Sequence, residues 1–188
     1  MARGLVLGVG INDLPRYHNC PFYSRWKGII RRCFGERNDR HYEGCQVAEQ
    51  WLRFSAFKVW MEQQPWLGNH LDKDILSPGA RIYRPETSVF VPSILNNLAI
   101  ERPSQRGDLP VGVSRTKCGK PFMARVHWLD GSRTSVGSFD CPHEAHRAWA
   151  IAKAGVIQQA VDQYRTTDRF DERVCIALLD RAYQLAAT

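Results

Sequence analysis

The chain has 188 residues, a formal net charge of +7 and a hydrophobic fraction of 44%. This composition is typical of a folded protein with one large or two small domains, and it excludes a disordered chain. No apolar run approaches the roughly 18 residues that a membrane span needs, and the N-terminus lacks a secretory signal, so we expect a cytoplasmic protein without a membrane partner. The surplus of positive charge is compatible with a polyanionic partner such as nucleic acid.

A basic amphipathic helix is predicted to begin at Pro21, over the segment PFYSRWKGIIRRCF. Its apolar residues recur at roughly helical spacing, and its other surface carries Arg25, Lys27, Arg31 and Arg32. This surface is either an ordinary solvated face or one that contacts DNA phosphates. Seven Lys and Arg against two acids between residues 16 and 40 favour DNA contact.

A second helix is predicted over residues 47–63, before Pro65 and Gly68. An aromatic stripe runs along it, made of Trp51, Phe54, Phe57, Trp60 and Met61. Such stripes usually belong to the core, so we expect this one to pack against the first helix.

Six cysteines occur in the chain, and none forms a CxxC pair. The spacing favours reduced, partly buried thiols over a disulfide scaffold. Thiolate and imidazole also suit zinc, which leaves an alternative zinc site with irregular ligand spacing. Its ligands would come from His18, Cys20, Cys33, His41 and Cys45.

The segment from residue 70 to residue 97 is predicted to form a strand, a turn, short strands and a helix. If residues 70–76 form a strand, His70, Asp72 and Asp74 share one face, while Lys73 lies on the other and has no catalytic role. The helix over residues 92–98 carries Asn96. Carboxylate and amide oxygens bind hard divalent cations, and histidine can accept a proton from water. Two aspartates around a lysine are equally typical of a solvated strand edge.

The run LDKDIL…YRPETSVFVPSILNN resembles the HNH (ββα-metal) nucleases, particularly phage homing-type endonucleases, and the similarity covers most of residues 17–98. It implies a DNA endonuclease in the host cytoplasm that uses Mg²⁺ or Mn²⁺, with zinc as the second choice. Asp72 and Asp74 would be the strand ligands, Asn96 the helix ligand and His70 the base. Many members place histidine beside the aspartate, whereas His70 precedes Asp72 by two residues. The site is therefore either a variant or an inactive scaffold.

Residues 101–110 (ERPSQRGDLP) are predicted to be a linker between a domain at 1–100 and a domain at 111–188. The segments VGVSRT, KPFMARVHWL and SRTSVGSF then predict a three-stranded antiparallel sheet, with a hairpin turn at Asp130-Gly131. Asp140 is predicted to cap a helix over residues 143–164. The face of that helix expected to lie on the sheet carries Ala145, Ala148, Trp149, Ala152 and Val156.

The second region resembles the AP2/ERF DNA-binding domain in GVSR at 112–115, GKPFMARV at 119–126, VGSF at 136–139 and HEAHRAWAIAK at 143–153. In that family the sheet lies in the DNA major groove. The resemblance implies contacts with double-stranded DNA from Arg115, Lys117, Lys120, Phe122, Arg125 and Arg133. Strand alternation leaves open that Phe122 is a core residue. The target sequence of the plant members does not transfer, because Phe122, Arg125 and Ser135 depart from their pattern.

The predicted class is α+β: a helical region with an HNH-like ββα-metal unit, then an AP2-like sheet packed on a helix, and a C-terminal helix over residues 168–185. That last helix either packs on the second domain or forms a contact in a homodimer. The function implied is a DNA endonuclease targeted by an AP2-like domain, without a small-molecule cofactor. The alternative is a catalytically inactive, sequence-specific DNA-binding protein on the same scaffold.

Overall fold

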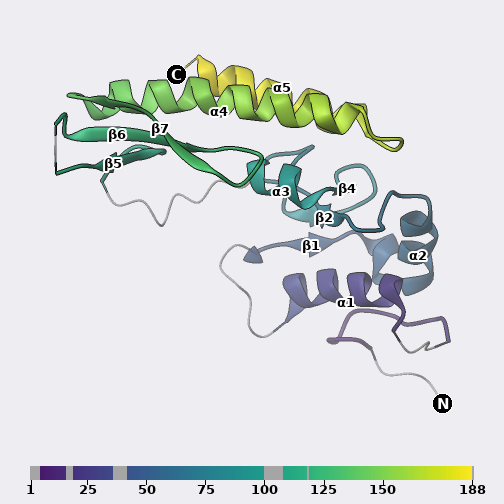
Figure 1. Ribbon diagram of the computed structural model, residues 1–188. Helices are drawn as coiled ribbons and strands as arrows, with labels where there is room; N and C mark the ends of the chain where they lie inside the picture. The colour runs from purple at the N-terminus through teal and green to yellow at the C-terminus, as the bar shows by residue number, and fades with distance from the viewer. Residues whose placement is uncertain (1–4, 16–18, 36–41, 100–107, 118, 188) are drawn as a thin grey trace. The chain divides into compact units, whose positions relative to one another are not determined.

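The computed structural model describes residues 5–15, 19–35, 42–99, 108–117 and 119–187 (Figure 1). Helices and small sheets occur together, so the predicted α+β class is confirmed. The chain divides into two compact units, Met1–Ser93 and Ile94–Thr188. Each helix in the described ranges is too short or too polar to be a membrane span. Within the predicted linker, residues 101–107 lie outside the described ranges.

The first unit combines helices with two small two-stranded sheets. The strand β1 pairs with β3 in parallel, and β2 pairs with β4 in antiparallel orientation. The helix α3 follows β4, and its first residue is the last residue of the unit. The elements of this unit are α1 (Pro21–Phe34), β1 (Gln46–Val47), the 3₁₀ helix η2 (Glu49–Leu52), α2 (Phe54–Glu62), β2 (His70–Asp72), β3 (Ile82–Tyr83) and β4 (Val89–Val91). Apart from Ser93, α3 (Ser93–Ala99) belongs to the second unit.

The helix α1 forms as the sequence predicts. Pro21 occupies its first turn, where a missing N–H costs no hydrogen bond. Its buried stripe contains Trp26, Ile29, Ile30 and Cys33, so the basic residues between them remain on the outer surface.

The prediction of one continuous helix over residues 47–63 is wrong in its first half. Val47 belongs to β1, and Arg53 has extended backbone angles (φ −90°, ψ 126°) between η2 and α2. A long-range pairing explains the break: Ile11 N–H donates to the Leu52 carbonyl at 2.7 Å, and Phe54 N–H donates to the Ile11 carbonyl at 2.9 Å. These bonds use backbone groups that a helix would need for itself.

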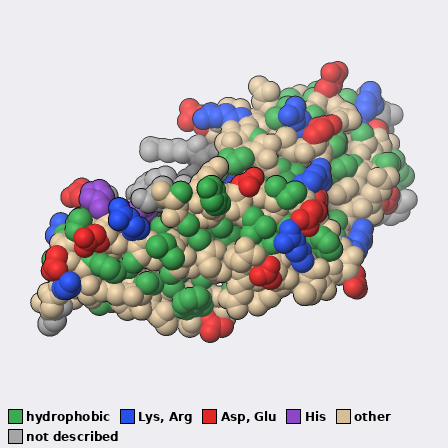
Figure 2. Space-filling view, turned by 90° about the horizontal axis from the view of Figure 1, so that it is seen from above, with side chains coloured by type: hydrophobic (Ala, Val, Ile, Leu, Met, Phe, Trp, Pro, Cys, Tyr) green, Lys and Arg blue, Asp and Glu red, His purple; other side chains and the backbone are tan. Residues whose placement is uncertain are grey.

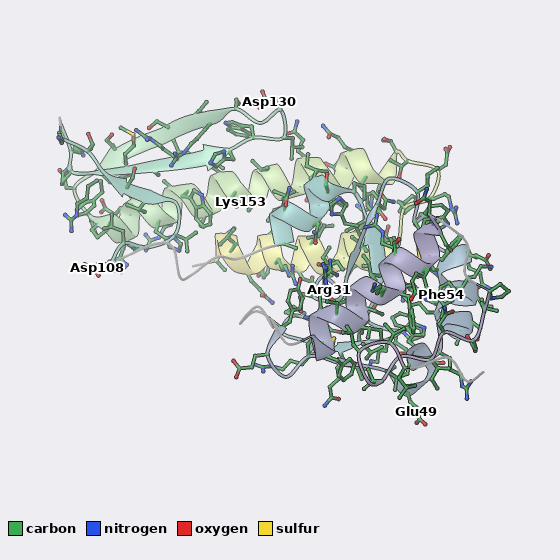
Figure 3. All side chains as sticks on the ribbon, turned by 90° about the horizontal axis from the view of Figure 1, so that it is seen from below. Arg31, Glu49, Phe54, Asp108, Asp130 and Lys153 are labelled. Atoms are coloured by element: carbon green, nitrogen blue, oxygen red, sulfur yellow. The ribbon has the colours of Figure 1, made fainter. Side chains whose placement is uncertain are left out.

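The predicted aromatic stripe forms the core of the first unit. Trp51, Phe54, Phe57 and Met61 are buried, and Trp60 is half-buried with its ring 4.4 Å from that of Trp51. Figure 3 labels Phe54 on α2 among the clustered side chains of this unit. The indole N–H of Trp26 donates to the Trp51 carbonyl at 2.7 Å, which ties α1 to η2.

The second unit is a three-stranded antiparallel sheet, ordered β5-β6-β7, with two long helices. Figure 1 shows α4 along one face of the sheet and α5 beside α4, and α4 packs against all three strands. The predicted sheet is therefore confirmed, and Asp130 marks the β6–β7 hairpin in Figure 3. The elements are β5 (Val113–Arg115), β6 (Phe122–His127), β7 (Arg133–Phe139), α4 (Pro142–Arg165) and α5 (Glu172–Ala186).

Two helix details in this unit differ from the sequence prediction. The N-cap of α4 is Cys141, whose side chain makes no capping bond, and Asp140 instead pairs with Lys120 at 2.9 Å. The predicted contact face of α4 is only partly buried, with Ala145 and Val156 fully covered. A second side of α4 is covered by α5, whose own buried residues are Val174, Cys175, Leu178 and Ala182.

Candidate functional site

The sheet of the second unit has one face covered by α4 and one face that carries exposed polar side chains. Successive strand residues point to opposite faces, and in β6 Ala124 and Val126 are buried while Arg125 and His127 are exposed. Arg125 lies opposite Ser135, and His127 lies opposite Arg133. We call the surface formed by Met123, Arg125, His127, Arg133, Ser135 and Ser138 the open face.

The open face is positively charged. None of the three strands contains an aspartate or glutamate, so Arg125 and Arg133 have no acidic neighbour within the sheet. Arg125 Nε donates only a weak bond, to Met123 Sδ at 3.1 Å. Figure 2, which looks down on α4 and α5, shows Lys and Arg interspersed with Asp and Glu on that opposite side. The positive surface is thus a property of the sheet.

The sequence analysis missed His127. Its place on the open face follows from the alternation that places Arg125 there two residues earlier. An exposed imidazole beside Arg133 adds a donor and acceptor to this surface.

The remaining predicted DNA contacts of this unit do not lie on the open face. Arg115 and Phe122 are cross-strand partners, and their side chains point to the face of the sheet opposite the open face. The Arg115 guanidinium carbon lies 5.4 Å from the centroid of the Phe122 ring. Phe122 is half-buried, which supports its assignment to packing. Lys117 is exposed in the β5–β6 connection, and Lys120 is engaged with Asp140.

The four predicted contacts on α1 divide into two kinds. Lys27 and Arg31 are exposed, and Figure 3 labels Arg31 on this helix. Arg25 donates to the Asn69 carbonyl at 3.2 Å. Arg32 donates to the Tyr83 hydroxyl at 3.4 Å and therefore has a role within the fold.

The strand predicted over residues 70–76 is wrong beyond Asp72, where β2 ends. Asp72 Oδ1 accepts the backbone N–H groups of Asp74 at 2.8 Å and Ile75 at 2.7 Å. Aspartate commonly turns a chain in this way, because its side chain replaces a backbone partner. His70 and Asp72 share a face of β2, but Asp74 lies outside the strand and strand alternation does not apply to it.

Lys73 is buried, with 6% of its surface exposed. Its Nζ donates to Asp74 Oδ1 and to the Ala80 carbonyl, both at 2.6 Å. The ammonium therefore holds the turn to the segment before β3 and neutralises the half-exposed Asp74 carboxylate. An ion-paired carboxylate is a weaker candidate for a metal ligand than Asp72.

Asp72 and Asn96 each keep an oxygen that the described chain does not use. Asp72 Oδ2 accepts no hydrogen bond there, and burial raises the pKa of this carboxyl although two backbone N–H groups lower it. Asn96, on α3, has a buried Oδ1 without a hydrogen-bond partner. Each oxygen is by itself a type that a hard divalent cation prefers. Asp72 belongs to the first unit and Asn96 to the second. His70 is exposed at the start of β2.

The alternative zinc site stays a prediction. His18 and His41 lie outside the described residues. Within the described ranges, no three His, Cys, Asp or Glu side chains are grouped so that they could hold a metal ion. Cys33 and Cys45 are both buried, whereas Cys20 is half-buried.

Two features therefore stand out chemically. One is the open face of the sheet. The other is the turn after β2 in which Asp72 accepts the N–H groups of Asp74 and Ile75, which we call the Asp72 turn. The open face carries Arg125, His127 and Arg133 without acidic neighbours in its strands. The turn carries a half-buried carboxylate with one uncommitted oxygen. Comparisons of the chain with family models, curated proteins and solved structures give no match, so its function has to be inferred from its own residues.

Proposed function

We propose that this protein binds double-stranded DNA through the open face of the β5-β6-β7 sheet. The observation that supports the proposal is the placement of Arg125, His127 and Arg133 on one exposed face of strands that contain no acid. Phosphates provide affinity for such a face whatever the base sequence. Base edges provide the discrimination.

The chemistry of the open face suits a DNA groove. The major groove, about 12 Å wide, admits a β-ribbon. Serines 135 and 138 on the face are short, so the arginines project beyond them. Arginine donates two parallel hydrogen bonds to guanine O6 and N7 or to a phosphate, and histidine can donate beside it.

Removing either arginine of the open face is expected to weaken DNA binding. Arg125→Ala and Arg133→Ala should each lower affinity by roughly 5- to 150-fold, the equivalent of about 1–3 kcal/mol for a base contact. If the lost contact is to a phosphate, the slope of log affinity against log salt should flatten by about 0.9. Fluorescence anisotropy with a labelled random-sequence duplex, titrated at several salt concentrations, measures both quantities.

Arg147→Ala is the matched control, since it removes one exposed arginine from α4. Its affinity and salt slope should stay close to those of the wild-type chain. Equal losses in all three variants would assign the effect to net charge and contradict a binding role for the open face.

Metal-dependent cleavage of the bound DNA is the second candidate function, supported by the uncommitted Asp72 Oδ2 atom and by the resemblance to HNH nucleases. Asp72 would hold a divalent cation. A cation bound there would neutralise the phosphate and stabilise the leaving oxygen. His70, on the same face of β2, would take the proton from the attacking water.

Asp72→Asn is the sharpest test of cleavage. Asparagine keeps the oxygen that accepts the Asp74 and Ile75 N–H groups, so the turn should survive while the negative charge is lost. We expect nicking of supercoiled plasmid in Mg²⁺ or Mn²⁺ to fall at least about 100-fold, as when a metal site is disturbed.

Two further variants separate the roles around the turn. His70→Ala should slow nicking by about 10²–10⁴-fold and leave metal affinity nearly unchanged, if His70 is the base. Asp74→Asn should lower the nicking rate less than Asp72→Asn does, because the Asp74 carboxylate is already paired with Lys73. Wild-type nicking by Asp72→Asn would remove this turn from the mechanism. DNA binding without nicking in either metal would favour the inactive DNA-binding alternative.

A further inference from the structure

Met123 is the one apolar residue among the six that form the open face. It is half-buried in β6, two residues before Arg125, and Arg125 Nε donates to its Sδ atom at 3.1 Å. This contact places the two side chains next to each other on the same face of the sheet. The proposed DNA contacts use the charged and hydroxyl groups of the open face and leave the thioether without a role.

Met123 lies in the middle of a row that crosses all three strands. Its cross-strand partners are Ser114 in β5 and Ser138 in β7, so the side chains of both serines point to the open face as well. Methionine is the longer side chain, and its terminal methyl group can extend beyond both serines. The row therefore holds a flexible apolar group at its centre, with a short polar group on each side.

The edge of a DNA base in the major groove carries one apolar group, the C5-methyl of thymine, and 5-methylcytosine carries the same group. Residues two apart along a strand are separated by about 6.7 Å, which is the rise of about two base pairs. With β6 along the groove and Arg125 on a guanine, Met123 therefore meets a base edge within two base pairs of that guanine. The thioether is a weak hydrogen-bond acceptor, so a guanine oxygen can replace it as the partner of Arg125.

We propose that Met123 makes the open face selective for a pyrimidine C5-methyl group within two base pairs of the guanine that Arg125 contacts. This inference rests on the proposed binding of double-stranded DNA by the open face. Thymine is the ordinary source of the methyl group, and 5-methylcytosine is the second source. Arg125 and Arg133 supply affinity, and Met123 adds a preference for sequence.

The test starts with the full chain and a pool of duplexes with a randomised core, from which the bound molecules are selected and sequenced. We expect guanine to be enriched together with thymine within two base pairs. The selected duplex is then made with thymine, uracil, cytosine or 5-methylcytosine at that position, each with its Watson–Crick partner. Uracil differs from thymine only by the missing methyl group, so its affinity should be lower by about fourfold, the value of one buried methyl or methylene group. Cytosine should bind more weakly than 5-methylcytosine by a similar factor.

Three variants separate a direct contact from other roles. Met123→Ala should bind the thymine and uracil duplexes equally, because the side chain that covers the methyl group is lost. Met123→Leu keeps an apolar side chain of similar volume without the sulfur, so it should retain the preference. Val136→Ala is the matched control, because Val136 is a 39% exposed apolar residue of β7 that is not one of the open-face residues. Its preference for thymine over uracil should equal that of the wild-type chain.

The outcomes distinguish this inference from the proposed function. If the selected duplex shows no thymine near the guanine, or binds equally with thymine and uracil, while Arg125→Ala still weakens binding, the role of Met123 is overturned and DNA binding by the open face stands. A preference that survives in Met123→Ala or disappears in Val136→Ala also overturns the inference. Loss of the preference in Met123→Leu would assign the effect to the sulfur that holds Arg125 and would equally overturn a direct contact. A chain that binds no duplex would overturn both proposals.

Discussion

Gly112→Ala is expected to destabilise the second unit by about 2–5 kcal/mol, and the upper end of this range is exceptional for a single substitution. Gly112 has a φ of +79°, where an alanine costs roughly 1–2 kcal/mol. An added Cβ would also lie 2.1 Å from Trp149 Cγ and 2.3 Å from two further indole atoms. Relieving such an overlap by moving the core typically costs another 1–3 kcal/mol, occasionally more.

The Trp149 ring is half-buried and packs against a neighbouring ring. It stacks on His146 with ring centroids 5.5 Å apart. His146 Nδ1 lies 2.8 Å from the Val111 carbonyl, which can only accept, so Nδ1 carries the proton of that bond. This bond fixes Val111, the residue beside Gly112, to α4. The overlap of an added Cβ with Trp149 therefore disturbs the packing between the sheet and α4.

Gly119→Ala and Gly131→Ala are the matched controls for this prediction. Both positions have a similar φ, +73° and +83°, but no atom within 4 Å of an added Cβ. Urea unfolding followed by hydrogen exchange of the β6 amides should give losses of roughly 1–2 kcal/mol for the controls. A loss of that size for Gly112→Ala would mean that the indole accommodates the methyl group.

The sequence predicted elements whose signals are local. The helix α1 follows from apolar periodicity after Pro21, and the sheet of the second unit follows from short strands around Asp130-Gly131. The break at Arg53 could not be predicted in this way, because it depends on Ile11, which lies far away in the sequence. Long-range backbone pairing overrode a helical pattern that is locally sound.

In the candidate sites, too, local patterns placed some residues correctly, and contacts that form only on folding placed the others. Alternation in β6 places Arg125 on the open face, and the same rule would have found His127. Around Asp72 the alternation rule failed, because the side chain bonded to the backbone and ended the strand. The partners of Lys73 were unpredictable from spacing, since Ala80 reaches its ammonium only after the turn has formed.

Trp51→Ala is expected to lower the stability of the first unit by about 3–5 kcal/mol, the usual cost of truncating a buried tryptophan. Trp51 is 1% exposed and contacts Phe57 and Trp60 at ring distances of 5.2 and 4.4 Å. The Trp26 indole bonds to the backbone carbonyl of Trp51, which an alanine retains. The loss therefore reports side-chain packing and leaves that hydrogen bond in place.

Val59→Ala on α2 is the comparison for this loss, because Val59 is 59% exposed and its truncation should change stability by no more than about 0.5 kcal/mol. The stability loss of Trp51→Phe should lie between those of Trp51→Ala and Val59→Ala. Phenylalanine keeps an aromatic ring against Phe57 but leaves part of the indole volume empty. Urea unfolding monitored by circular dichroism ranks the three variants. If Trp51→Ala and Val59→Ala have the same free energy of unfolding, the aromatic stripe does not hold α2 to η2. The core of the first unit must then depend on Trp26 and its neighbours in α1.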